Sequence, residues 1–213
     1  MTRARVLLAD DHTVVAEGLR ILLAPHFDVL RIVSDGRELV TVAKALDPDV
    51  VVLDISMPSL SGIEAARQLR SAGLRAKLVF LTMHREVAYA VRALEAGAAG
   101  FVLKHSAGSE LVTAIQEALK GGKYITPQIA GDVLDSMRSG THAGVTASDE
   151  LTPRQREVLQ LVAEGRSAKQ IAAALRISRR TAEFHKARLM ATLGVHNTAE
   201  LIQFAMRTGV APL

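Results

Sequence analysis

The chain has 213 residues, 49% of them hydrophobic and 23% charged, and a formal net charge of +4. This length allows one or two domains, and the composition is typical of a globular protein with enough apolar material for a core. No apolar stretch approaches the roughly 18 residues that a membrane-spanning helix needs, so we expect no membrane partner, and the lack of cysteine excludes disulfides and thiolate metal sites.

Residues 1–122 alternate short apolar runs with stretches that repeat apolar residues at helical spacing. Such runs are typical of buried parallel strands, and the stretches between them of amphipathic helices. Five strand–helix units with short connections predict an α/β fold with a doubly wound, five-stranded parallel sheet of the flavodoxin-like type. The predicted strands are 5–9, 28–33, 50–53, 77–81 and 100–103, and the predicted helices are 14–23, 37–46, 63–71, 87–96 and 109–119.

The first apolar run stops at Asp10, only a few residues after the basic start Met1–Arg5. A secretory signal peptide needs a longer apolar stretch than this. Together with the absence of cysteine, the short run leads us to expect a cytoplasmic protein.

Four of the predicted strands end on side chains that phosphoryl chemistry uses. Asp10 and Asp11 follow the first strand, and Asp54 follows the third. Thr82 follows the fourth strand and Lys104 the fifth. A lone Asp after a strand is usually a helix cap or a turn residue. Because ligands gather at the carboxyl ends of the strands in an open α/β sheet, however, this set of residues predicts one shared crevice.

Asp54 is the candidate phosphoryl acceptor, since a carboxylate attacks phosphorus to form an acyl phosphate. Asp10 and Asp11 would hold a divalent cation that relieves the repulsion among the three carboxylates. Mg²⁺ suits this role because it takes few protein carboxylates and keeps water and phosphate oxygens as its other ligands. Lys104 would neutralise one phosphoryl oxygen, and the Thr82 hydroxyl would donate a hydrogen bond to another.

Residues 123–149 are predicted to join two domains. A short helix is expected at 127–137, whereas 139–149 are small and polar without periodicity, which is typical of a linker. Residues 150–213 form the second domain, for which capping residues predict a compact bundle of helices. The predicted caps are Thr152, Ser167, Ser178 and Asn197, and the helices run to about Ala163, Leu175, Leu193 and Met206.

The positive charge of the chain is concentrated near its end. Residues 1–122 carry 14 Lys and Arg against 14 Asp and Glu, whereas residues 151–213 carry 10 against 4. A basic excess on a small helical domain suggests a polyanionic partner such as nucleic acid, although a solvated basic face would have the same composition.

Four motifs at the predicted strand ends carry a family resemblance. They are Ala9–His12, Leu53–Pro58 with Gly62, Leu81-Thr82 and Gly100–Lys104. Over residues 3–122 the chain resembles a response-regulator receiver domain. The resemblance implies that Asp54 takes a phosphoryl group from a sensor histidine kinase, and that the backbone carbonyl of Ser56 also ligates Mg²⁺. It further implies that Phe101 is a switch aromatic, which turns inward when Thr82 moves toward the phosphate.

Two positions beside the predicted site depart from the usual receiver pattern. Met83 stands after Thr82, where receivers often have a small residue, and its bulk would narrow access to the phosphate. His84 follows and is expected to be exposed, either influencing dephosphorylation or serving only as a surface residue.

Within residues 150–213 the predicted helices give the order helix, tight turn, helix. In a helix-turn-helix domain the second of these helices enters the major groove of DNA. The segments Leu151–Leu159, Ile171–Ser178 and Leu193–Val195 resemble a LuxR-type DNA-binding domain. Together with the receiver, this resemblance implies the NarL/FixJ class of response regulators.

The helix that starts after Ser178 is the predicted recognition helix, with Leu189 and Leu193 facing the core. The resemblance implies that Glu183, Phe184 and Ala187 face base edges. A second set of residues is better suited to phosphate contacts, which position the protein without reading sequence. These residues are Arg179, Arg180, Thr181, Lys186 and Arg188.

The combined resemblance implies a phosphorylation-activated transcription regulator of a two-component system, not an enzyme that turns over a substrate. Its expected partners are double-stranded promoter DNA, a cognate sensor histidine kinase and, after phosphorylation, a second copy of itself. RNA polymerase is a further candidate partner. The helix 198–206 is expected to join two DNA-binding domains, and such a dimer would read half-sites about 10 bp apart.

Two other functions are compatible with part of the pattern. A phospho-aspartate phosphatase of the haloacid dehalogenase type would usually have a second Asp two residues after the nucleophile, but this chain has Ser56 there. A DNA-binding or scaffold protein that works without phosphorylation would retain the receiver residues without using them.

Overall fold

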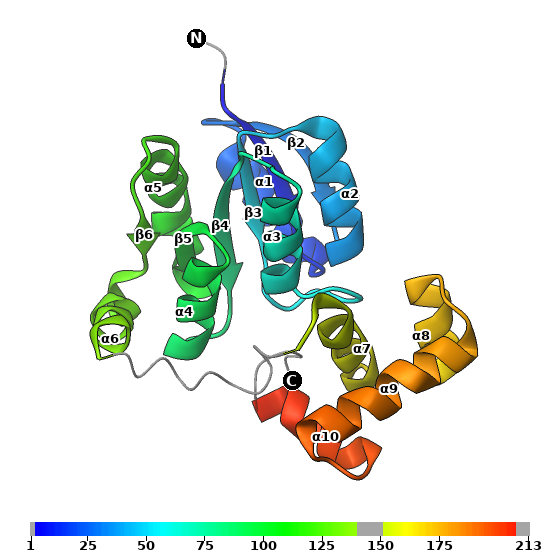
Figure 1. The fold of residues 1–213 in the computed structure, drawn as a ribbon. Coiled ribbons are helices and arrows are strands. Elements are labelled where there is room, and N and C mark those ends of the chain that lie inside the picture. The colour runs from blue at the N-terminus through cyan, green and yellow to red at the C-terminus, as the bar shows by residue number, and fades with distance from the viewer. Residues whose placement is uncertain (1–2, 140–150, 208–213) are drawn as a thin grey trace. The chain divides into compact units, whose positions relative to one another are not determined.

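The computed structural model describes residues 3–139 and 151–207, which form two compact units (Figure 1). The first unit is an α/β sheet with its helices, and the second consists of helices alone. In the described ranges no helix combines the length and the apolar character that a membrane crossing needs.

A parallel sheet with the strand order β2-β1-β3-β4-β5-β6 forms the centre of the first unit. Every strand and helix predicted for residues 1–122 is present, which confirms the doubly wound α/β topology. The strands are β1 (Arg5–Ala9), β2 (Asp28–Val33), β3 (Val50–Leu53), β4 (Lys77–Thr82) and β5 (Ala98–Leu103). The helices are α1 (Thr13–Leu23), α2 (Gly36–Leu46), α3 (Gly62–Ser71), α4 (Val87–Glu95) and α5 (Ala107–Leu119).

The sheet has one strand more than the sequence predicts. β6 (Tyr124–Ile125) runs parallel to β5, with Gly100 opposite Tyr124 and Phe101 opposite Ile125. The predicted number of strands, five, was therefore too small by one strand. A strand of two residues is too short to show the apolar run or the alternation by which strands are recognised in a sequence.

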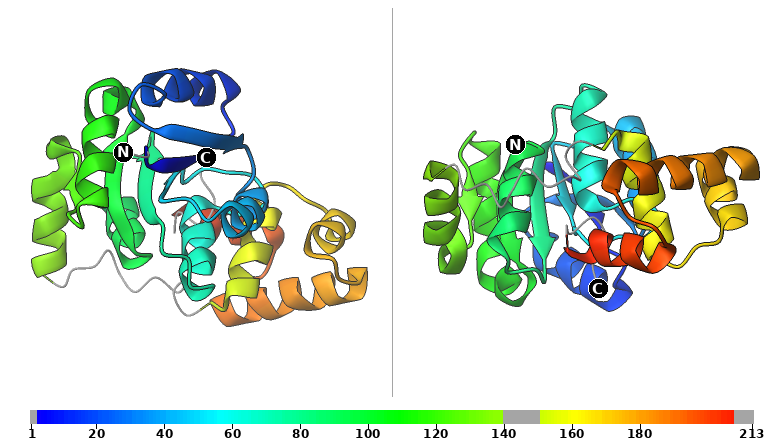
Figure 2. Two further views of the ribbon diagram at one scale, coloured as in Figure 1. Left: turned by 90° about the horizontal axis from the view of Figure 1, so that it is seen from above. Right: turned by 60° about the horizontal axis from the view of Figure 1, so that its bottom comes forward.

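Helices cover both faces of the sheet (Figure 2). On one face, α1 and α5 pack against side chains that include Val6, Val52 and Val102. Because successive residues of a strand point to opposite faces, Leu7 and Val51 face the other layer, which holds α2, α3 and α4. Burial on both faces explains why the central strands are continuous apolar runs.

The predicted linker begins with structure that belongs to the first unit. After β6, helix α6 (Pro127–Arg138) packs against α4. Proline suits the first turn of α6 because the amide hydrogen that it lacks has no partner within the helix. The helix expected at 127–137 is thus present, and the remainder of the predicted linker, residues 140–149, lies outside the described residues.

The second unit consists of the helices predicted from their caps: α7 (Pro153–Ala163), α8 (Ala168–Leu175), α9 (Arg179–Leu193) and α10 (Thr198–Arg207). The hydroxyls of Thr152, Ser167 and Ser178 each accept a hydrogen bond from a backbone amide in the first turn of α7, α8 and α9. In α9, Leu189 is fully buried and Leu193 packs against the same core, which confirms their predicted inward orientation.

Candidate functional site

Asp10, Asp54 and Lys104 meet at the carboxyl ends of β1, β3 and β5. The Nζ atom of Lys104 lies 2.7 Å from Asp54 Oδ2 and 2.8 Å from Asp10 Oδ2. Each of the two acidic residues is only 3% exposed. One ammonium group therefore bridges two buried carboxylates that come from adjacent strands.

The register of the sheet explains this placement. Ala9 of β1 lies opposite Leu53 of β3, so the next residues, Asp10 and Asp54, leave the sheet side by side. The Asp10 amide donates to Val33 O at 3.0 Å, and the Asp54 amide donates to Ala9 O at 2.9 Å. Both backbones are still hydrogen-bonded to neighbouring strands, so the sheet rather than a loop fixes the position of the two carboxylates.

Asp11 and His12 form the outer part of the same cluster. The ligand atoms of Asp10, Asp11, His12 and Asp54 all lie within 4.8 Å of one another. His12 Nδ1 is 2.9 Å from Asp11 Oδ1 and 3.3 Å from Asp10 Oδ1. His12 is not among the site residues predicted from the sequence, although its position directly after the Asp pair was a signal for it.

The charges of the cluster do not balance. Burial raises the pKa of Asp54, Lys104 offsets only part of that effect, and the Asp10 carboxylate adds to it. Burial would lower the pKa of Lys104, but the carboxylates of Asp54 and Asp10 outweigh burial and raise that pKa. Lys104 therefore stays charged and contacts two of the three carboxylates of the cluster, those of Asp10 and Asp54. A divalent cation fits the cluster, since Asp10, Asp11 and Asp54 offer the oxygen ligands that Mg²⁺ prefers.

Thr82, Ser56 and Phe101 lie on β4, in the loop after β3 and on β5, which are the segments that carry or adjoin the acidic cluster. Thr82 is fully buried, and its Oγ1 accepts a hydrogen bond of 3.2 Å from the His84 amide. The Ser56 amide lies 3.3 Å from Asp54 Oδ1, which places the loop after β3 directly beside the candidate acceptor. Phe101 is fully buried in β5, so its ring occupies an inward position in this structure.

Gly62, at the start of α3, is part of the same site. A Cβ atom on this residue would lie 1.9 Å from the backbone oxygen of Asp54. The Gly62 amide also donates to Ile55 O at 2.9 Å. Only glycine lets α3 begin this close to Asp54, which explains the glycine of the Leu53–Pro58 motif in steric terms.

The two residues after Thr82, Met83 and His84, differ in their exposure to solvent. Met83 is 67% exposed, so most of its side chain is in contact with solvent. The side chain of His84 is only 20% exposed, and its ring packs on Tyr89 with 4.4 Å between ring centroids. The expectation of an exposed His84 was therefore wrong, because Tyr89 and Ser56 on neighbouring segments both contact the imidazole.

In the second unit, α9 presents a basic outer face with one large aromatic side chain. Phe184 is 59% exposed. The residues predicted to contact base edges, Glu183, Phe184 and Ala187, are all exposed on this helix. Arg179, Arg180 and Arg188 are exposed beside them. An exposed phenylalanine among arginines matches the groups that nucleic acid offers, which are apolar base surfaces and phosphates.

Some side chains of α9 already have partners within the second unit. Arg179 Nε donates to Glu183 Oε1 at 2.8 Å, one helical turn further on. Lys186 Nζ donates to Thr198 Oγ1 at 2.8 Å, and Thr181 contributes to the cap at Ser178. Arg180 and Arg188 are thus better placed for phosphate contacts than Thr181 or Lys186.

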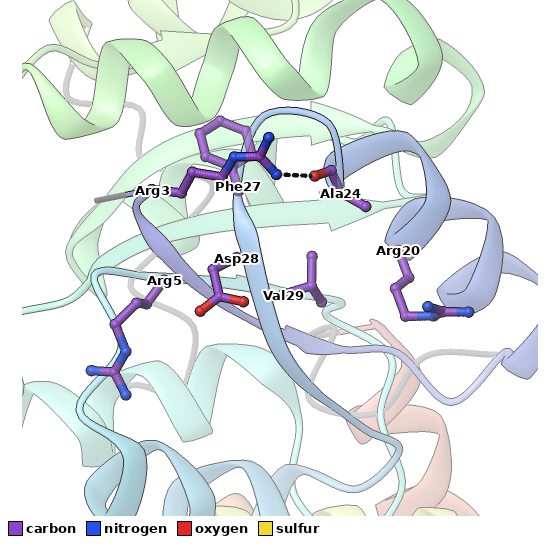
Figure 3. Close-up of a pocket in the computed structure, with 7 residues that line it drawn as sticks. All are labelled: Arg3, Arg5, Arg20, Ala24, Phe27, Asp28 and Val29. Carbon is purple, nitrogen blue, oxygen red and sulfur yellow. Dashed lines mark hydrogen bonds between the residues drawn. The ribbon is translucent and has the colours of Figure 1, made fainter. Parts of the chain in front are cut away.

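A hollow at the opposite edge of the sheet, near the amino ends of β1 and β2, is lined by Arg3, Arg5 and Arg20 (Figure 3). The three guanidinium groups do not converge on one point. Arg3 donates to Ala24 O, Arg5 donates to the carbonyls of Leu46 and Asp47, and Arg20 pairs with Glu17. This hollow therefore lacks the shared focus that the carboxyl edge has.

Known proteins resemble both units of the chain. The model of the response regulator receiver domain matches residues 6–116, and that of the bacterial regulatory proteins of the luxR family matches residues 149–205. The transcriptional regulatory protein MctR of Rhizobium johnstonii is 36% identical over 98% of this chain and 95% of its own length.

Solved structures give the same result. A two-component response regulator of the LuxR family from Aurantimonas is 38% identical, with a TM-score of 0.60, over 64% of this chain and 99% of its own. The response regulator RcsB in a complex with DNA is 28% identical, with a TM-score of 0.59, over 97% of this chain and 99% of its own. The chain therefore belongs to the two-component response regulators that join a receiver domain to a LuxR-type DNA-binding domain.

Proposed function

We propose that Asp54 is the phosphoryl acceptor of this response regulator and that its phosphorylation controls DNA binding by the second domain. The observation that carries the proposal is the Lys104 ammonium, which lies 2.7 Å from Asp54 Oδ2 within a cluster of three carboxylates. The proposed division is a receiver at 1–122, a linker at 123–149 and a DNA-binding domain at 150–213.

In the proposed reaction, an Asp54 oxygen forms a bond to the phosphorus of a phosphohistidine on the kinase. The phosphorus–nitrogen bond breaks, and its electron pair stays on the histidine nitrogen. Lys104 balances the charge that the phosphoryl group brings, and the buried Thr82 hydroxyl donates to one of its oxygens. These groups act on the protein's own phosphorylation, and we propose no reaction with a separate substrate.

We propose that Asp10, Asp11, Asp54 and the backbone carbonyl of Ser56 hold Mg²⁺ in the receiver. When bound, Mg²⁺ would supply positive charge that keeps Asp54 ionised and neutralises phosphoryl oxygens. The fit rests on the carboxylates of Asp10, Asp11 and Asp54, whose ligand atoms lie within 4.8 Å of one another and of His12, while the Lys104 ammonium contacts those of Asp10 and Asp54.

We propose that α9 enters the major groove of promoter DNA. The structure of the related response regulator RcsB in a complex with DNA supports this proposal. Glu183, Phe184 and Ala187 would face base edges, with Phe184 against a thymine methyl group. Phosphate contacts fall first to Arg180 and Arg188, then to Arg179, whose partner Glu183 would have to release it. Thr181 and Lys186 would contact phosphates only after giving up their hydrogen bonds within the second unit.

The proposal includes a homodimer formed after phosphorylation and a cognate sensor histidine kinase as phosphoryl donor, with RNA polymerase as a further partner. The structures of RcsB include two dimers bound to two parallel DNAs, which supports a dimeric DNA-bound state in the family. A dimer of this chain would read half-sites about one helical turn apart.

The test is electrophoresis in a gel that retards phosphoproteins, after incubation with acetyl phosphate and Mg²⁺. We expect a retarded band for the wild type and for Asp132→Ala, which removes an exposed carboxylate on α6. Asp54→Ala should give no such band. If the band persists in Asp54→Ala, or never forms in the wild type, Asp54 is not the acceptor.

A further inference from the structure

We propose that His12 gives the acidic cluster of the receiver a nitrogen ligand, so that a late transition-metal ion such as Zn²⁺ competes there with Mg²⁺. The observation that carries this inference is the placement of His12, whose ligand atom lies within 4.8 Å of those of Asp10, Asp11 and Asp54. The inference rests on the proposed Mg²⁺ site, because it assigns a second class of cation to the same carboxylates.

The imidazole of His12 lies against the carboxylates although most of the side chain is exposed. Its Nδ1 atom is 2.9 Å from Asp11 Oδ1 and 3.3 Å from Asp10 Oδ1, and the side chain is 61% exposed. His12 is the N-cap residue of α1, but its side chain makes no capping hydrogen bond there. The ring is therefore not needed to start the helix. Within residues 3–139 and 151–207, its polar contacts are with the acidic cluster.

The distances from His12 are close to those between two ligands of one metal ion. Four ligands at the usual zinc bond length of about 2.0–2.1 Å lie about 3.3–3.4 Å apart in a tetrahedron. Both distances from His12 Nδ1 are within about 0.5 Å of that separation. Because Asp11 and His12 are open to solvent, rotation of their side chains would bring the four ligand atoms into such a shell.

The two oxygens of Asp10 have different partners. Oδ2 contacts Lys104 Nζ at 2.8 Å, whereas Oδ1 accepts a hydrogen bond of 2.9 Å from the His12 amide and lies beside the imidazole. A cation held at Oδ1 would therefore not have to displace Lys104. The exposed side chains of Asp11 and His12 give such a cation a path from solvent to the buried carboxylates.

The mixed set of ligands distinguishes between classes of cation. Mg²⁺ prefers oxygen ligands and keeps several of its waters. An imidazole nitrogen instead suits Zn²⁺ and its late first-row neighbours, provided that the ring is neutral and Nδ1 carries the free electron pair. His12 therefore adds affinity for the zinc class of ions and none for Mg²⁺.

Occupation by a zinc-class ion would oppose phosphorylation. With His12 and three carboxylates, Zn²⁺ would have four protein ligands, which is a closed site without an open position. Mg²⁺ in the same cluster would keep positions for phosphoryl oxygens. Asp54 would also be held as a ligand of the ion, and its oxygen would not be free to bond to phosphorus.

Isothermal titration calorimetry of the full chain measures its affinity for Zn²⁺ and for Mg²⁺ separately. The test variant is His12→Gln, which removes the imidazole and keeps a polar side chain at an exposed position. The matched control is His26→Gln, which replaces an exposed histidine in the turn between α1 and β2. In the wild type and the control, excess Mg²⁺ should weaken the apparent binding of Zn²⁺, since the two ions share one site.

We expect His12→Gln to bind Zn²⁺ at least about tenfold more weakly, since even the loss of a residue that only orients a metal ligand costs about 10- to 100-fold. Its affinity for Mg²⁺ should stay within about twofold of the wild type, because Mg²⁺ takes oxygen ligands. Electron paramagnetic resonance with equimolar Cu²⁺ provides a second readout. Hyperfine splitting from a histidine nitrogen should be present in the wild type and in His26→Gln and lost in His12→Gln.

Phosphorylation by acetyl phosphate with Mg²⁺ provides the third readout. Added Zn²⁺ should slow it in the wild type and in His26→Gln, and slow it less in His12→Gln. If Zn²⁺ does not slow it in the wild type, the closed zinc site does not form.

Three other results would overturn the inference. They are an unchanged affinity of His12→Gln for Zn²⁺, binding of Zn²⁺ that excess Mg²⁺ does not weaken, and equal weakening of Zn²⁺ and Mg²⁺ binding in His12→Gln. A wild type that takes no phosphoryl group at Asp54 would instead refute the proposed function. The calorimetry needs no phosphoryl donor, so it would still decide whether His12 is a metal ligand.

Discussion

Lys104 shows how much of the proposed chemistry depends on single residues. Its side chain is 6% exposed, and the Nζ atom is within 2.8 Å of carboxylate oxygens of both Asp10 and Asp54. Its raised pKa, which arises because those carboxylates outweigh burial, keeps it charged. Removal of this charge leaves buried acids facing one another, which is more costly than the loss of an exposed ion pair.

We therefore predict that Lys104→Met lowers the free energy of unfolding by about 3 kcal/mol at neutral pH without Mg²⁺, because the buried carboxylates lose their partner. Added Mg²⁺ should restore part of this loss. Urea denaturation of the wild type, this variant and the exposed control Lys120→Met provides the comparison. If the free energy of unfolding falls equally in both variants, the Lys104 charge does not stabilise the buried carboxylates.

A second prediction concerns Gly62. In Gly62→Ala the new methyl group would clash with the backbone oxygen of Asp54. Because the backbone must shift to remove this clash, we expect the free energy of unfolding to fall by about 1–3 kcal/mol. Gly131→Ala in α6 is the control, since its new Cβ meets nothing within 4 Å and should stabilise the helix by up to about 1 kcal/mol. Thermal denaturation compares the two, and a harmless Gly62→Ala would contradict the steric argument.

A third prediction uses the two tyrosines of the chain, which contains no tryptophan. Burial first and then Glu86 raise the pKa of Tyr89, and burial first and then Glu110 raise the pKa of Tyr124. Ultraviolet titration should place both ionisations above pH 10 in the folded protein and near the ordinary value in denaturant. Because the unfolded chain loses these protons first, stability should fall as the pH rises above about 10. Identical folded and unfolded titrations would contradict these shifts.

At the scale of whole elements, β6 and α6 are connected to the strand that carries the site. The Thr126 amide donates to Phe101 O at 2.9 Å, and the Leu103 amide donates to Thr126 Oγ1 at 3.1 Å. Thr126 Oγ1 also donates to Glu110 Oε2 at 2.7 Å. A movement of Phe101 in β5, or of Lys104 directly after β5, would therefore be transmitted to the segment that starts α6.

The fourth prediction tests that connection. Thr126→Val keeps the shape of the side chain but leaves the Leu103 amide and Glu110 without this buried partner, which should cost about 1–3 kcal/mol in chemical denaturation. Thr41→Val is the control, because its exposed hydroxyl bonds only within α2 and its loss should change stability by at most about 0.5 kcal/mol. If Thr126→Val is as neutral as the control, β6 and α6 are not anchored in this way.

The main elements of both units could be predicted from the sequence, because short apolar runs, helical periodicity and capping residues are local signals. β6 could not, since its two residues carry no pattern. The cluster of Asp10, Asp54 and Lys104 followed from the rule that parallel strands end at one edge. His84 was misjudged because its burial depends on Ser56 and Tyr89, and a pairing between side chains of separate segments leaves no periodic trace in the sequence.

At the scale of the whole molecule, the family assigns a receiver and a DNA-binding domain to one chain. The receiver part is neutral overall and holds an acidic cluster, while residues 151–213 carry 10 Lys and Arg against 4 Asp and Glu. We propose that phosphorylation of Asp54, which would add about 1.5 to 2 negative charges, controls DNA binding by this basic segment, although the two lie far apart in the sequence.

The decisive experiment incubates the purified full-length protein with fragments of the source genome, with and without acetyl phosphate and Mg²⁺. The fragments that the protein retains are then sequenced. We predict a small set of promoter fragments that carry paired half-sites about 10 bp apart. These fragments should be retained by the phosphorylated wild type and lost in Asp54→Ala. If Asp54→Ala retains the same fragments at the same salt concentration, phosphorylation of Asp54 does not control DNA binding.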